Sequence, residues 1–142
     1  MKALITGASS GIGKDMAIYL SECGFDLILC GRNKESLEQL QSSLKTKVKV
    51  IIIDLADEKK VKDLYMVTRN ENVDVLINNA GFGLFGDYNS CDLLTELKMI
   101  DVNVRAVHIL TRMFLKDMVK RNKGYILNVA SSAGLLRGGP LM

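Results

Sequence analysis

Short apolar runs alternate along the sequence with longer stretches in which apolar residues recur at helical spacing. This alternation predicts the α/β class, a parallel sheet with helices on both faces, because parallel strands are joined by crossovers that are usually helical. The apolar runs predict five strands, which we expect to be buried on both faces because their polarity hardly alternates: residues 2–6, 26–30, 48–53, 73–78 and 125–130. The stretches between them predict helices at residues 11–23, 34–44, 57–69 and 93–120, and a glycine-rich loop is expected at 134–140.

Charge and cysteine content narrow the possible partners. The 142 residues carry a net charge of +3, from both signs, with no basic block longer than Lys59-Lys60. We therefore expect neither nucleic acid nor a membrane as partner, and no apolar run approaches the length of a membrane span. Cys23, Cys30 and Cys91 form no Cys-x-x-Cys pair, which argues against a disulfide framework and a metal site and favours a reducing, cytoplasmic setting.

The first predicted strand runs directly into a glycine turn and then into a helix. In this frame the first backbone N–H groups of the helix and its dipole can meet a diphosphate. Gly7 permits the tight turn, Gly11 lets phosphates approach closely, and Gly13 lets the helix pack against the sheet. An ordinary glycine-rich connection is the alternative. The segment is Thr6-Gly7-Ala8-Ser9-Ser10-Gly11-Ile12-Gly13.

The spacing Thr-Gly-x-x-x-Gly-x-Gly resembles the signature of the short-chain dehydrogenase/reductase family. The resemblance implies a Rossmann-type, doubly wound sheet that binds a nicotinamide dinucleotide, with cofactor contacts at Thr6, Gly7, Ser9, Ser10, Gly11, Ile12 and Gly13. It covers essentially the whole chain but only the first five strands of the family's fold, so residues 1–142 correspond to a dinucleotide-binding domain that is incomplete at its C-terminal end. The strand at 125–130, which has neither charge nor proline, would be an unprotected sheet edge. We therefore expect that the natural polypeptide continues or that another chain covers this edge.

The end of the second strand predicts which nicotinamide cofactor is preferred, because it lies beside the adenosine ribose in this fold. The sequence there is Cys30-Gly31-Arg32-Asn33, without the acidic residue that would accept from a ribose 2′-hydroxyl. Arg32 offers a planar pair of donors to a 2′-phosphate, which favours NADP(H) over NAD(H), with Ser9 and Lys34 as further candidate contacts. A solvated loop arginine is the alternative.

Two further segments match the family's cofactor-binding pattern. Asp54-Leu55 follows the third strand and resembles the family's adenine-contacting pair, although Asp54 could instead help to start the next helix. Asn78-Asn79-Ala80-Gly81 follows the fourth strand and reproduces the family's Asn-Asn-Ala-Gly turn, in which small residues let the backbone pass beside the cofactor. The cofactor-binding set therefore also includes Asp54, Leu55, Asn79, Ala80 and Gly81, whereas Asn78 is interpreted as structural.

Two residues are candidate catalytic groups. Asn103 lies on a helix face predicted to point inward, where an amide needs a partner, and the resemblance makes it the asparagine that holds a helix distortion and a catalytic water. Ser131 ends the segment Asn128-Val129-Ala130-Ser131 and resembles the family's serine, which hydrogen-bonds the substrate oxygen. The alternatives are a satisfied core or surface asparagine and a serine that only ends a strand. His108, the only histidine, is interpreted as a helix-face residue.

The resemblance implies an oxidoreductase that transfers a hydride between NADP(H) and a small-molecule carbonyl or alcohol, and a homo-oligomer, as is common in the family. The family also needs a tyrosine as general acid/base and a lysine four residues later, both after the serine. All the tyrosines precede Ser131 and none has that lysine. We therefore expect these 142 residues alone to be a poor catalyst. A non-catalytic dinucleotide-binding or sensing module is the alternative function.

Overall fold

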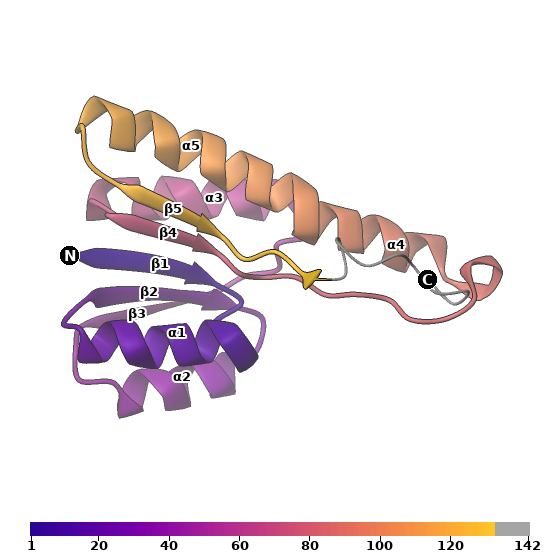
Figure 1. Ribbon diagram of the computed structural model, residues 1–142, viewed down its shortest axis with the longest axis horizontal. Helices are drawn as coiled ribbons and strands as arrows, with labels where there is room; N and C mark the ends of the chain where they lie inside the picture. The colour runs from indigo at the N-terminus through magenta and orange to yellow at the C-terminus, as the bar shows by residue number, and fades with distance from the viewer. Residues whose placement is uncertain (133–142) are drawn as a thin grey trace.

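The strands of the computed structural model, which describes residues 1–132, lie parallel in one sheet (Figure 1). Their order is β3-β2-β1-β4-β5, so the chain builds outward from β1 to β3 and then returns to the other side of β1. The strands are β1 Lys2–Thr6, β2 Asp26–Gly31, β3 Val48–Ile52, β4 Val75–Asn78 and β5 Tyr125–Asn128. This order confirms the predicted doubly wound sheet, and its reversal beside β1 marks the place where such sheets bind ligands. The loop expected at 134–140 lies outside the described residues.

Helices cover both faces of the sheet (Figure 1). One face carries α1 and α2, and the other carries α3 and the long segment that contains α4 and α5. Asn33, Asp57 and Asp92 each accept a hydrogen bond from a backbone N–H near the start of α2, α3 or α4, which fixes where those helices begin. The bounds are α1 Gly11–Glu22, α2 Lys34–Ser43, α3 Glu58–Thr68, α4 Leu93–Ile100 and α5 Val107–Lys120, with 3-10 turns η1 Arg69–Glu71 and η2 Tyr88–Ser90.

The pleat of the central strands divides the core between the two faces. Leu4 and Ile28 belong to a buried cluster with Phe114 of α5, whereas Ile5 belongs to a second cluster with Leu37 of α2. Successive side chains of a strand point to opposite faces, so a continuous apolar run supplies both clusters. This arrangement explains why β1, β2 and β4 carry almost no polar side chains.

The prediction that all five strands are buried on both faces is wrong for β3 and β5, which are the edges of the described sheet. In β5, Tyr125 is 66% exposed and Leu127 is 45% exposed, and in β3 Ile52 is 47% exposed. An edge strand has a neighbour on one side only, which leaves part of its side chains uncovered. The apolar runs therefore did not distinguish β3 from a central strand, whereas β5 had been expected to be an edge from the family resemblance.

The helix predicted at residues 93–120 is not one regular α-helix. A six-residue π-helix, η3 Asp101–Ala106, separates α4 from α5. A π-helical turn contains more residues than an α-helical turn and therefore changes the direction in which neighbouring side chains point. The helix distortion that the family resemblance implied at Asn103 is thus present.

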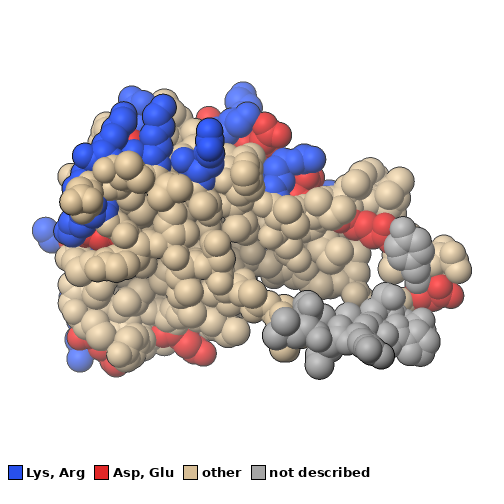
Figure 2. All heavy atoms as spheres, turned by 45° about the horizontal axis from the view of Figure 1, so that its top comes forward, with Lys and Arg blue, Asp and Glu red and all other residues tan. Residues whose placement is uncertain are grey.

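Basic side chains gather over α5 in three dimensions, although the sequence contains no long basic block. Figure 2 shows Lys and Arg along the outer face and C-terminal end of this helix, where Arg112, Lys116, Lys120 and Lys123 are exposed. Arg112, Lys116 and Lys120 recur every four positions and so fall on one side of the helix, and Lys123 follows shortly after its end. Their clustering is a consequence of helical periodicity, which counting adjacent charges does not detect.

Candidate functional site

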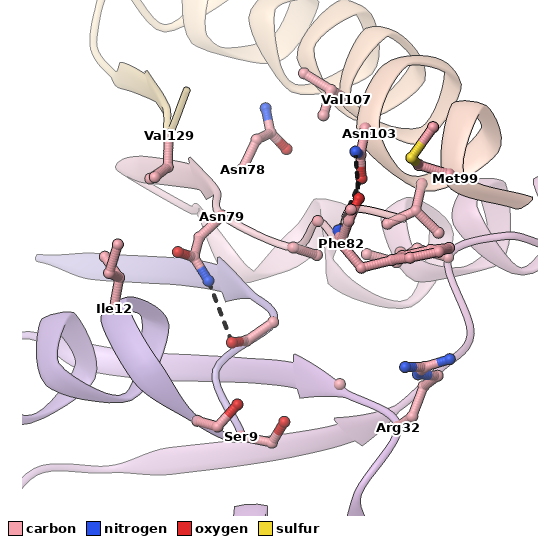
Figure 3. Close-up of a pocket in the computed structure, with 18 of the residues that line it drawn as sticks. Ser9, Ile12, Arg32, Asn78, Asn79, Phe82, Met99, Asn103, Val107 and Val129 are labelled. Carbon is pink, nitrogen blue, oxygen red and sulfur yellow. Dashed lines mark hydrogen bonds between the residues drawn. The ribbon is translucent and has the colours of Figure 1, made fainter. Parts of the chain in front are cut away.

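A cleft of about 1170 Å³ lies along the carboxyl ends of the strands. Segments that follow all five strands line it, together with the helical residues around η3 (Figure 3). Most of the predicted site residues meet in this one cleft: Gly7, Ser9, Ser10, Ile12, Arg32, Asp54, Leu55, Asn79, Ala80, Gly81, Asn103 and Ser131. Thr6, Gly11 and Gly13 were also predicted to contact the cofactor, but they do not line the cleft.

The glycine turn after β1 is packed tightly against the turn after β4. Gly7 has a φ of +67°, and a Cβ on it would lie 2.8 Å from the Cα of Ala80. A Cβ on Gly13 would collide with the carbonyl oxygen of Gly7 and the side-chain amide of Asn79. Gly11, with a φ of +52°, has open space where its Cβ would be. The first and third glycines therefore permit close packing within the protein, whereas Gly11 faces open space.

Thr6 is a structural residue of this turn and is not exposed to the cleft. Its hydroxyl is buried, donates to the carbonyl oxygen of Ile77 at 3.3 Å, and accepts from the backbone N–H groups of Asn79 and Ala80 at 3.0 Å each. The hydroxyl of Thr6 is therefore bonded inside the protein, and a contact between Thr6 and a cofactor stays a prediction. Thr6 joins β1 to the turn after β4, because its side chain already satisfies its hydrogen-bonding capacity inside the protein.

The start of α1 lies at the cleft and has no side-chain cap. Ser10 occupies the capping position in extended conformation without a side-chain hydrogen bond, and no acidic residue lies in the first turn. In contrast, α2, α3 and α4 are all capped by side chains. The first N–H groups of α1, together with the positive end of the helix dipole, can therefore interact with an anion.

Arg32 follows β2 and lines the cleft on the same side as Ser9 (Figure 3). The arginine is exposed and makes no ion pair within residues 1–132. Lys34, the other basic candidate, pairs with Glu38 at 3.7 Å and does not line the cleft. Asn33 does line it while capping α2, a residue that sequence reasoning did not assign to the site although its capping position was a usable signal.

Asp54 and Leu55 form the part of the cleft that follows β3. The carboxylate of Asp54 accepts a hydrogen bond from the backbone N–H of Ala56 at 3.0 Å. The helix-starting role that was the alternative for Asp54 belongs instead to Asp57, which accepts from the backbone N–H groups of Lys59 and Lys60. Asp54 therefore shapes a local turn and still faces the cleft.

Asn103 lies in the middle of η3 and holds the loop that follows β4 (Figure 3). Its side-chain oxygen accepts from the backbone N–H of Phe82 at 3.0 Å, and its side-chain nitrogen donates to the carbonyl oxygen of Phe82 at 2.8 Å. The hydrogen-bond partner that the Asn103 amide was expected to need is thus the backbone of Phe82. The expected inward orientation is wrong, because Asn103 is exposed at the cleft.

The end of β5 supplies Asn128, Val129, Ala130 and Ser131 to the cleft. Ser131 is exposed. His108 is exposed on α5 and does not line the cleft, in agreement with its interpretation as a helix-face residue. Burial raises the pKa of the Cys30 thiol, next to Gly31, so this cysteine is a neutral core group.

Three apolar residues that line the cleft were not predicted as site residues: Met99, Val102 and Val107. All three belong to the helical segment around η3, and Phe82 lines the same cavity from the loop after β4. Met99, Val102 and Val107 lie in or close to the π-helix η3, whose bounds were not predicted from the periodicity of the sequence.

Other kinds of site receive no support within the part of the chain that the structure describes. No three His, Cys, Asp or Glu side chains of residues 1–132 are grouped as metal ligands would be. Among the same residues no helix is both long and apolar enough to cross a bilayer. The tyrosines whose side chains are described do not line the cleft.

The sequence matches a family model described as short chain dehydrogenase over residues 1–141. It is 40% identical over 135 residues to an uncharacterized short-chain type dehydrogenase/reductase of Sinorhizobium fredii, covering 94% of this chain and 52% of that protein. It is 34% identical over 143 residues to the very-long-chain 3-oxoacyl-CoA reductase of Homo sapiens, covering 94% of this chain and 46% of that protein. The chain thus spans about half the length of these relatives.

Solved structures give the same result for the fold. A short-chain dehydrogenase from Sphingobium yanoikuyae in complex with NADPH superimposes with a TM-score of 0.88 at 29% identity, covering 94% of this chain and 55% of that one. The family match, the shared fold and the glycine turn at the strand reversal agree with one another. The chain therefore belongs to the short-chain dehydrogenase/reductase family and corresponds to its N-terminal portion.

Proposed function

We propose that this protein transfers a hydride between NADP(H) and the carbonyl or alcohol group of a small molecule. The observation that carries this proposal is the start of α1, an uncapped helix N-terminus at the cleft behind a turn of closely packed glycines. Such a terminus stabilises a diphosphate through its N–H groups and its dipole. The family membership of the chain supports the same class of reaction.

The residues of the cleft fit a dinucleotide. Ser9, Ser10 and Ile12 line it at the glycine turn, where backbone N–H groups would hold the diphosphate. Asp54 and Leu55 would contact the adenine from the end of β3. In the turn after β4, Asn79, Ala80 and Gly81 would pass beside the ribose next to the nicotinamide, while Thr6, Gly11 and Gly13 shape the glycine turn.

Arg32 supports NADP(H) rather than NAD(H) as the cofactor. It lines the cleft beside Ser9 and has no ion-pair partner among residues 1–132, so its guanidinium is available to a 2′-phosphate. The position carries no carboxylate that would repel such a phosphate. The relative from Sphingobium yanoikuyae was solved with NADPH, which is consistent with this assignment.

When bound, NADP(H) supplies or accepts the hydride. Ser131 would hydrogen-bond the substrate oxygen and stabilise the negative charge that develops on it during reduction. Asn103 would keep the Phe82 backbone, and with it one wall of the cleft, in place. In the family the proton comes from a tyrosine assisted by a lysine four residues later, and no tyrosine of residues 1–142 has that lysine, so we propose that these 142 residues alone are nearly inactive.

The apolar wall formed by Phe82, Met99, Val102 and Val107 favours a substrate with an apolar part beside its carbonyl. The human relative is named for 3-oxoacyl-CoA reduction, so a 3-oxoacyl thioester is the first substrate to test. Because the cysteine content favours a reducing compartment, we further propose that the protein acts in the cytoplasm. Because oligomers are common in the family, we propose that it is a homo-oligomer.

The test uses the natural protein encoded by the complete reading frame. Calorimetric titration should detect binding of NADPH, and binding of NADH should be weaker. With NADPH deuterated at the transferable position of the nicotinamide, a 3-oxoacyl thioester should yield a hydroxy product that carries the deuterium. Ser131→Ala should keep NADPH binding and lower kcat by roughly 10²- to 10³-fold. Absence of binding to either nucleotide would refute the proposal, and binding without turnover on a panel of carbonyl compounds would favour the sensing module.

A further inference from the structure

Asn78, at the end of β4, joins three elements through one buried side chain. Only 3% of its surface is exposed. Its side-chain nitrogen donates to the side-chain oxygen of Asn128 at 2.8 Å and to the hydroxyl of Thr111 on α5 at 3.0 Å. Asn78 and Asn128 are also direct partners in the register of β4 and β5. The amide therefore uses both of its N–H groups, one toward β5 and one toward α5.

The backbone of Asn78 adds a third contact to the same segment. Its carbonyl oxygen accepts from the backbone N–H of Val129 at 2.9 Å. β5 is an edge of the described sheet, so the contacts with β4 are the sheet contacts that hold it within residues 1–132. Beyond Val129 the chain enters the cleft with the exposed residues Ala130 and Ser131. Asn78 is thus hydrogen-bonded to β5 and to the residue after it, immediately before the segment that contains Ser131.

The oxygen of the Asn78 side chain is the one buried side-chain polar atom of the described residues without a hydrogen-bond partner in the protein. Asn78 is also a lining residue of the cleft (Figure 3). An unsatisfied buried amide oxygen costs stability, so a residue that only had to hold two strands together would be better replaced by an apolar one. The orientation of this amide is fixed by its two donor contacts and not by its oxygen.

We propose that Asn78 is a positioning residue that, through Asn128, sets the direction in which Ser131 enters the cleft, and that Thr111 fixes the Asn78 amide for this task. The proposal rests on the proposed function, because it assumes that Ser131 contacts the substrate. A merely structural Asn78 would stabilise the sheet without affecting what Ser131 does. If Asn78 positions Ser131, substituting Asn78 should no longer change kcat once the Ser131 hydroxyl has been removed.

Thr111 gives the sharpest test because its hydroxyl can be removed with little change in side-chain shape, as in Thr111→Val, or kept, as in Thr111→Ser. In the natural protein, Thr111→Val should lower kcat by roughly three- to tenfold, and Thr111→Ser, which keeps the hydroxyl, should restore it to within about twofold. Asn78→Ala should lower kcat by roughly 10- to 100-fold. In each case the Kd for NADPH should change by less than about twofold, because neither side chain is assigned to the cofactor.

The same substitutions are then made in a Ser131→Ala background. Positioning predicts that Asn78→Ala and Thr111→Val have almost no further effect on kcat there, because effects of residues that act through one group are not additive. Equal losses of kcat in both backgrounds would overturn the proposal, as would a Thr111→Val protein as active as Thr111→Ser.

Hydrogen exchange separates failure of this inference from failure of the proposed function and needs no turnover. The amides of residues 129–131 should exchange at least about tenfold faster in Thr111→Val and in Asn78→Ala, while those of β1 keep their protection. The control is Ser21→Ala, which removes another buried hydroxyl, bonded to Thr46 at 3.0 Å, and should leave both kcat and exchange at 129–131 unchanged. Unchanged exchange at 129–131 in the Asn78 and Thr111 variants would overturn the positioning role even if the protein reduces carbonyls.

Discussion

The side chain of Asn79 donates to the carbonyl oxygen of Thr6 at 3.0 Å, while the hydroxyl of Thr6 accepts from the backbone N–H of Asn79 at the same distance. The two residues are 73 positions apart and lie at the ends of β1 and β4, where the strand order of the sheet reverses. This reciprocal pair fixes the glycine turn against the neighbouring turn. The shape of the proposed diphosphate site therefore depends on a long-range contact as much as on the glycines themselves.

Replacing Thr6 tests this dependence. Thr6→Val keeps the shape of the side chain but leaves the backbone N–H groups of Asn79 and Ala80 without their acceptor, which should lower the free energy of unfolding by about 1–3 kcal/mol. Urea unfolding would measure the loss, and a titration with NADPH should show weaker binding. Thr6→Ser, which keeps the hydroxyl, is the matched control. Equal stability of the Val and Ser variants would contradict the role of the hydroxyl.

Arg32 should decide between the two nicotinamide cofactors. Arg32→Asp removes a guanidinium and adds a carboxylate that repels a 2′-phosphate, so NADPH should bind roughly 10- to 100-fold more weakly while NADH binding holds or improves. Parallel calorimetric titrations measure both constants. Arg112→Asp, an exposed position on α5 away from the cleft, provides the control for the charge change. An equal loss for both cofactors would reject the phosphate contact.

Acid should unfold the protein partly through Glu71. Its carboxylate lies 2.6 Å from the ammonium of Lys2 and 2.9 Å from that of Lys49, and the hydrogen bonds from these lysines lower the pKa of Glu71 from 4.5 to about 2. Because the folded-state pKa is the lower one, this stabilisation is complete above about pH 4.5 and disappears as the pH falls toward 2.

The stability difference between the unmodified protein and Glu71→Gln should therefore be largest near neutral pH and should shrink between pH 4.5 and 2. Chemical unfolding at a series of pH values measures it. Glu38→Gln, which removes an exposed pair with Lys34, should have little effect at any pH. A Glu71→Gln difference that stays constant through this window would show that the ion pairs do not act as described.

β5 is an edge of the sheet within residues 1–132, so we expect the isolated 142-residue chain to self-associate. Unpaired N–H and C=O groups of an edge strand pair readily with another chain, and Leu127 adds exposed apolar surface. Size-exclusion chromatography should show species larger than a monomer, and Leu127→Lys should shift the distribution toward the monomer. A stable monomer of the unmodified chain at high concentration would contradict this expectation.

Some segments of the site were predicted from the sequence more completely than others. The glycine turn, Arg32, Asp54 and the turn after β4 could be assigned from sequence because each is a short motif directly after a strand. The position of these motifs at the carboxyl ends of parallel strands follows from the fold class. Thr6 was predicted as a cofactor contact, and its buried hydroxyl bonds the turn after β4. A hydroxyl beside a glycine turn can face either the cleft or the next strand, and local sequence does not distinguish the two.

By itself the sequence determined the elements of this protein and their class. Continuous apolar runs, helical periodicity and turn glycines are local features of the sequence. The strands, helices and turns that they favour can therefore be predicted without knowing the tertiary contacts. The strand β1, the helix α1 and the turn between them were therefore expected within one or two residues of where they occur.

Only the tertiary structure decided that β3 is the second edge of the described sheet and which polar side chains hold others in place. Asn103 bonds a backbone 21 positions away, and Asn78 bonds residues 33 and 50 positions away. Such contacts exist only when packing brings distant segments within hydrogen-bonding distance. No periodicity within either segment encodes that distance.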